Sequence, residues 1–113
     1  MHEMSIAEGI VQLLEQQAVE QQYRRVRTVW LEIGPLAAVE TEALRFCFEA
    51  VTRDSLAEGA RLEIIELPAS GWCLGCASQI EIRQRYDSCP ACGSYQVQVT
   101  SGEELRIKEL EVD

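Results

Sequence analysis

Two Cys-x-x-Cys pairs constrain the fold of this chain more than any other feature of its sequence. Cys73 and Cys76 form the first pair, Cys89 and Cys92 form the second, and twelve residues separate the two pairs. Two residues between cysteines allow a tight turn to present both sulfur atoms to one ion. Two such turns at this spacing predict a closed tetrahedral site of four thiolates, which is typical of structural zinc. Zinc binding would supply folding free energy that so small a module cannot obtain from its own hydrophobic core.

Four cysteines in this pattern could also bind iron or form disulfides. Iron in the same cage would make a rubredoxin-like electron carrier, and paired disulfides would require an oxidising compartment. The chain has five cysteines, and an odd number favours metal ligands plus one remaining thiol. We expect the remaining thiol, Cys47, to be buried on the apolar side of a helix.

A second candidate metal site lies in the first three residues, Met1-His2-Glu3, which contain the only histidine of the chain. The terminal amine, the His2 backbone amide and the imidazole can close two chelate rings around one metal. These nitrogens occupy three corners of a square plane, an arrangement that favours Ni(II) or Cu(II) over zinc. Glu3 offers a carboxylate and a further amide. The motif therefore predicts a site formed by Met1, His2 and Glu3.

Composition and charge exclude several classes of function. The formal net charge is −9, which opposes the phosphate neutralisation on which nucleic-acid binding depends. No apolar run approaches the ~20 residues that span a membrane, and the first residues do not have the pattern of a signal peptide. We find no catalytic triad, phosphate-binding loop or dinucleotide motif. We therefore expect a cytoplasmic protein that is not an enzyme and has neither a membrane segment nor a nucleic-acid partner.

A first amphipathic helix is predicted near the N-terminus. Ser5-Ile6-Ala7-Glu8 has the pattern of a capping box, so we expect the helix to begin just after Ser5 and to end near Gln22. Residues before Ser5 would lie outside the helix. The apolar residues that recur at helical spacing are Ile6, Ile10, Leu13, Leu14 and Ala18.

The rest of the pattern predicts an α+β fold. Alternating β-branched and aromatic residues indicate strands, Gly and Pro mark their ends, and a second amphipathic stretch indicates another helix. The predicted elements are strands at 26–33, 61–67 and 104–112, a helix at 40–53, and a linker at 68–71. We expect a small mixed sheet of about three strands with two helices, to which the last strand returns, plus an inserted zinc-ribbon module.

The N-terminal motif and the cysteine pairs together resemble the HypA/HybF family of hydrogenase nickel-incorporation proteins. The resemblance rests on Met1-His2-Glu3-Met4-Ser5, the following helix, and the late CxxC and CPxCG pairs. It also includes the Gly34-Pro35-Leu36 loop and the closing strand from Glu104 to Leu110. In that family the residues matching His2 and Glu3 bind nickel, and those matching the four cysteines hold zinc.

The resemblance implies a nickel metallochaperone that acts with a HypB-type GTPase and delivers Ni(II) to the precursor of the hydrogenase large subunit. Zinc would be structural and nickel would be transient cargo. We assign residues 1–69 and 97–113 to a nickel-binding α/β domain and residues 70–96 to the inserted zinc module. A rubredoxin-like carrier and a zinc-ribbon adaptor protein are the alternatives.

Overall fold

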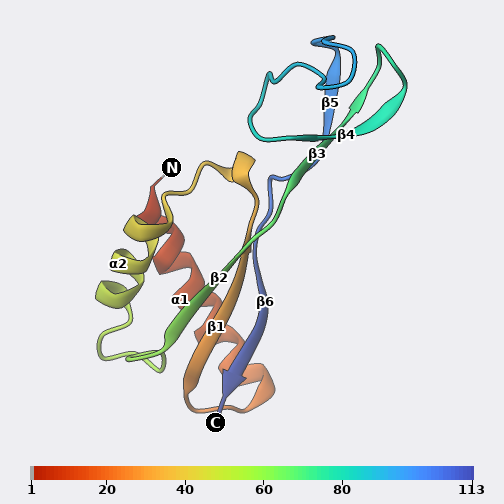
Figure 1. The fold of residues 1–113 in the computed structure, drawn as a ribbon. Coiled ribbons are helices and arrows are strands. Elements are labelled where there is room, and N and C mark those ends of the chain that lie inside the picture. The colour runs from red at the N-terminus through yellow and green to blue at the C-terminus, as the bar shows by residue number, and fades with distance from the viewer. Residues whose placement is uncertain (1) are drawn as a thin grey trace. The chain divides into compact units, whose positions relative to one another are not determined.

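The computed structural model describes residues 2–113 (Figure 1). Its elements in chain order are α1 (Glu3–Gln21), β1 (Val26–Ile33), the 3-10 helix η1 (Pro35–Ala37), α2 (Thr41–Val51), β2 (Arg61–Glu66), β3 (Ala69–Cys73), β4 (Ser78–Ile82), β5 (Val97–Ser101) and β6 (Leu105–Val112). The strands form two three-stranded sheets, of order β2-β1-β6 and β4-β3-β5. The predicted α+β class is confirmed.

The chain divides into two compact units. Unit 1 comprises the chain up to Leu31, Val39–Ile64 and Ile107–Asp113, and unit 2 comprises Glu32–Ala38 and Ile65–Arg106. Among residues 2–113, no helix combines the length and the apolar character needed to cross a membrane.

The sheet β2-β1-β6 has mixed strand directions, as predicted. The Leu67 amide donates to the Ile33 carbonyl at 2.9 Å, just beyond the C-terminal ends of β2 and β1, so these two strands are parallel. The Asp113 amide donates to the Arg25 carbonyl at 2.9 Å, after the end of β6 and before the start of β1, so β6 is antiparallel. Helix α2 connects β1 to β2, as a parallel pair requires.

Helices α1 and α2 pack against each other in unit 1 (Figure 1). The buried residues of α1 are Ala7, Ile10, Val11 and Leu14, which share one face at helical spacing. Leu13 was expected on that face but is 48% exposed, so the true face is displaced toward Ala7 and Val11. On α2, Leu44 and Phe48 are buried, and Cys47 is half-buried rather than fully enclosed.

The capping-box prediction for α1 is wrong. The helix begins at Glu3, and His2 occupies the N-cap position without a side-chain capping bond. The Ile6 amide donates to the His2 carbonyl at 3.2 Å and closes the first turn before Ser5. A tertiary hydrogen bond explains the earlier start, because the Glu3 carboxylate accepts from the Glu40 amide at 3.0 Å and anchors this turn.

The predicted linker at 68–71 is also mostly wrong, because Ala69 begins β3. In the antiparallel pair with β4, Ala69 lies opposite Ile82 and Gly71 lies opposite Ile80. A side chain at Gly71 would approach Val97 Cγ1 to 2.7 Å, so only glycine fits between the strands here. Three of the four residues of the predicted linker therefore belong to a strand, and at Gly71 a neighbouring strand packs closely against the chain.

We expect Leu44→Ala to lower the free energy of unfolding by about 2–5 kcal/mol, because Leu44 is fully buried and its truncation leaves a cavity. Phe46→Ala is the matched control on the same helix, since Phe46 is 73% exposed, and it should change stability by no more than about 0.5 kcal/mol. Urea denaturation of both variants measures the difference. Equal losses would contradict the burial of Leu44.

Candidate metal centres

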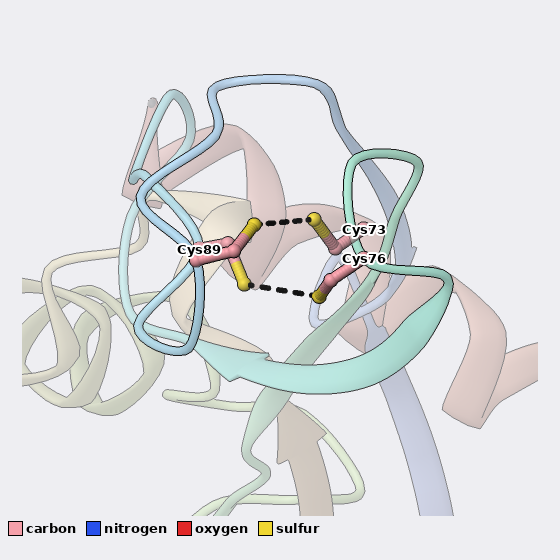
Figure 2. Close-up of side chains that lie close together, drawn as sticks. Cys73, Cys76 and Cys89 are labelled. Atoms are coloured by element: carbon pink, nitrogen blue, oxygen red, sulfur yellow. Dashed lines mark hydrogen bonds between the residues drawn. The ribbon is translucent and has the colours of Figure 1, made fainter.

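Two loops of unit 2 bring the four predicted cysteines together (Figure 2). Cys73 ends β3 and Cys76 lies in the turn to β4, while Cys89 and Cys92 lie in the segment between β4 and β5. The four Sγ atoms all lie within 4.8 Å of one another. Cys73 Sγ is 3.6 Å from Cys92 Sγ, and Cys76 Sγ is 3.8 Å from Cys89 Sγ.

These distances fit a tetrahedral metal site. With metal–sulfur bonds of about 2.3 Å, the sulfur atoms of a regular tetrahedron lie about 3.8 Å apart. Cys73 and Cys89 are buried, whereas Cys76 and Cys92 are exposed. Four protein ligands would complete the coordination shell, so the arrangement suits a structural ion and leaves no position for a substrate.

The backbone forms a tight turn at the second cysteine pair. The Gly93 amide donates to the Cys89 carbonyl, and the Cys89 amide donates to the Ser94 carbonyl, both at 2.8 Å. Gly93 has φ +78°, a left-handed conformation that glycine adopts without strain. Gly75 has a different role, because a Cβ atom there would lie 2.8 Å from Ser94 Cβ and 3.4 Å from Cys92 Sγ. The first loop can therefore approach the second only with glycine at position 75.

The electrostatics of the cage also favour a cation. The Cys92 amide, with that of Ala91, lowers the pKa of the Cys89 thiol to about 7. The Ser94 amide lowers the pKa of the Cys92 thiol, but the Cys73 sulfur, burial, and the sulfur atoms of Cys89 and Cys76 together outweigh it and raise that pKa to about 12. Thiols this close cannot all ionise alone, because each thiolate repels the next. A bound cation would remove this repulsion.

The first turn of α1 contains the described part of the other predicted site. His2 has extended backbone angles, φ −84° and ψ 94°, and is exposed. The first amides of a helix have no acceptor within it, so the His2 and Glu3 amides are not engaged in the hydrogen bonds of α1. Met1 lies outside the described residues, and its amine as a ligand stays a prediction.

Glu3 is held by a contact that the sequence did not reveal. Its Oε2 atom accepts from the backbone amide of Glu40, the N-cap residue of α2. This hydrogen bond is the main reason that the pKa of the Glu3 carboxyl is lowered. The two residues are 37 positions apart, and a backbone donor leaves no mark in the sequence.

Three comparisons with known proteins agree on one family. Residues 1–112 match the family described as hydrogenase/urease nickel incorporation, metallochaperone, hypA. The chain is 75% identical to hydrogenase maturation factor HypA of Azotobacter chroococcum mcd 1 and 74% identical to that of Azotobacter vinelandii, over the full length of each chain. It is also similar to the solution structure of the Ni metallochaperone HypA from Helicobacter pylori, with a TM-score of 0.70 and 27% identity, covering 99% of this chain and 97% of that chain.

We expect Cys89→Ser to abolish retention of one metal ion per chain, because Cys89 contributes one of the four clustered sulfur atoms and is a buried core residue. Cys47→Ser is the matched control, since Cys47 lies on α2 and is not part of the sulfur cluster. Elemental analysis after dialysis measures bound metal in both variants. Full metal content in Cys89→Ser would contradict a four-thiolate site.

Proposed function

Because the chain belongs to the HypA family of hydrogenase and urease nickel-incorporation metallochaperones, we propose that it binds Ni(II) through Met1, His2 and Glu3 and delivers it to the precursor of the hydrogenase large subunit. The position of His2 carries the proposal for the site. His2 is exposed at the N-cap of α1, and its amide takes no part in helical bonding. An imidazole and adjacent amides that are accessible together can chelate one metal ion.

The charge of the site suits a cation that must be captured and later released. The N-terminus of a helix carries a partial positive charge, which disfavours a nearby cation. The Glu3 carboxylate opposes that charge, and the Glu40 amide lowers its pKa, which favours the ionised form. A chelate at an exposed helix end also leaves coordination positions open to a competing partner. We propose that nickel leaves by such ligand exchange.

We propose that the ion in the cysteine cage is zinc and that it has a structural role. The sulfur distances fit zinc, and closure of the shell by four thiolates is typical of structural zinc sites. Iron in such a cage would give a coloured protein and an electron carrier. Zinc would give a colourless protein, so an absorption spectrum with elemental analysis separates the two.

The proposed partners follow from the family. They are a HypB-type GTPase and the hydrogenase large-subunit precursor, met in the cytoplasm. The net charge of −9 favours protein partners with basic surfaces over nucleic acid. A zinc-ribbon adaptor that binds nucleic acid would instead retard DNA in a gel at low salt.

We expect His2→Ala to abolish tight Ni(II) binding while zinc content and thermal stability stay unchanged, because the exposed imidazole has no role in the core. Ser5→Ala, an exposed change one turn later, should bind nickel normally. Isothermal titration of Ni(II) into protein with no residues ahead of Met1 measures this. Unchanged binding in His2→Ala would place the nickel site elsewhere.

Nickel affinity should fall steadily as pH decreases from about 8 to about 6. Amine and imidazole ligands must lose protons before they coordinate a metal, and such groups titrate in this range in model peptides. Protons therefore compete with the metal on the acidic side. Titrations across this pH range measure the effect, and a constant affinity would rule out the amine–imidazole–amide ligand set.

A further inference from the structure

A small hollow in unit 2 contains none of the four cysteines. Its volume is about 130 Å³. Tyr86 and Tyr95 line it together with Ile82, Val97 and Val99. Ile82 is buried, and the two valines pack partly buried against the core of unit 2, so the fold fixes this apolar surface. Apolar cavities of about 150 Å³ hold a molecule the size of benzene. The hollow therefore has the size for one branched aliphatic side chain.

The two tyrosines of the hollow are exposed to solvent. Tyr86 is 92% exposed and Tyr95 is 77% exposed. Tyr86 has φ +69°, a left-handed conformation that is rare for bulky residues and concentrated at functional positions. Asp87 holds this turn, because its Oδ2 atom accepts from the Arg83 amide at 3.1 Å and from the Gln84 amide at 3.0 Å. The fold thus keeps Tyr86 in a strained and exposed position beside an apolar hollow.

Strand β5 contributes two valines to the hollow and is also an edge strand. It is the last strand of the sheet β4-β3-β5 in the part of the chain that the structure describes. The Leu74 amide donates to the Gln96 carbonyl at 2.8 Å, which makes these residues a hydrogen-bonded pair of the β3–β5 ladder. Such pairs alternate along an antiparallel ladder, so Val99, opposite Gly71, directs its N–H and C=O away from β3. These two backbone groups are available to another strand.

We propose that the edge of β5 and the hollow form a docking site for an extended segment of a partner protein. The segment pairs antiparallel with Val99 and inserts a branched aliphatic side chain between Tyr86 and Tyr95. Addition of a strand to a sheet edge obtains affinity from main-chain hydrogen bonds and specificity from pockets for alternate side chains. Tyrosine is among the residue types that dominate binding energy at protein interfaces. Such docking uses unit 2 alone and requires no nickel ligand.

Charge indicates the kind of segment that fits. Unit 2 contains six acidic residues and three arginines, a net charge of −3, and zinc held by four thiolates would add about −2. A segment with Lys or Arg on either side of its aliphatic residue complements this charge. A second copy of the chain fits less well, because each copy has a formal net charge of −9. The register shift between Ser70 and Gly71 also interrupts the regular ladder of β5, which suits a short segment.

Fluorescent seven-residue peptides titrated into the zinc-loaded protein test the site from the ligand side. Their sequence alternates Lys and Thr around a central Ile, Val or Leu. We expect binding to weaken about 10-fold or more when the central residue is Ala, because the hollow then stays empty.

N-methylation tests the strand pairing. On the central residue, which faces Val99, it should weaken binding because it removes a donor to the β5 edge. On the next residue, whose N–H points away from β5, it is the matched control. Equal binding of the Ala peptide, equal effects of the two N-methyl groups, or no binding by any peptide of the panel would overturn the proposal.

Exposed variants test the site from the protein side. Tyr95→Ala should bind the Ile peptide about 10-fold or more weakly, with unchanged zinc content. Leu74→Ala is the matched control and should bind normally, since Leu74 is 53% exposed in the same unit and does not line the hollow. Equal affinities of the two variants would contradict the site. Analytical ultracentrifugation of the protein alone tests the other occupant: a dimer that Tyr95→Ala dissociates would assign the hollow to a second copy and overturn the proposal.

Discussion

Convergence of four sulfur atoms on one point is the constraint on which unit 2 depends. Its buried cluster contains six residues, and two of them are cage cysteines: Leu36, Ala69, Cys73, Ile80, Ile82 and Cys89. A core this small cannot offset the entropy of ordering its loops by apolar burial alone. A cation bound by the thiolates would supply the missing free energy and fix both loops at once. The sheet β4-β3-β5 and the cage therefore support each other.

Close backbone contacts connect the buried cluster of unit 2 to a segment far away in the sequence. Leu36 of η1 belongs to the buried cluster of unit 2, and its amide donates to the Gly102 carbonyl at 2.8 Å. Gly34 allows this approach, because a Cβ atom there would lie 2.1 Å from the Gly102 oxygen. The compact unit that holds the cysteines thus also includes the loop that follows β1.

Unit 1 shows how a local pattern can be overridden. Ser5 and Glu8 have the residue types of a capping box, yet α1 starts at Glu3 without any side-chain cap. The Glu40 amide supplies the contact that stabilises the earlier turn. His2 is consequently the N-cap residue itself, and Glu3 is the first residue of a helix that packs against α2.

Sequence alone determined the features that depend on local spacing. The two Cys-x-x-Cys pairs predicted the sulfur cage because each pair forms one tight turn, and the alternation in 26–33 predicted β1 because strand burial has a period of two. Tertiary structure decided what depends on distant partners. The Glu3–Glu40 hydrogen bond, the strand in place of the linker at Ala69, and the contact between Gly34 and Gly102 each join residues more than ten positions apart. A backbone group takes part in each of these contacts, and the choice of its partner leaves no periodic signal in the chain.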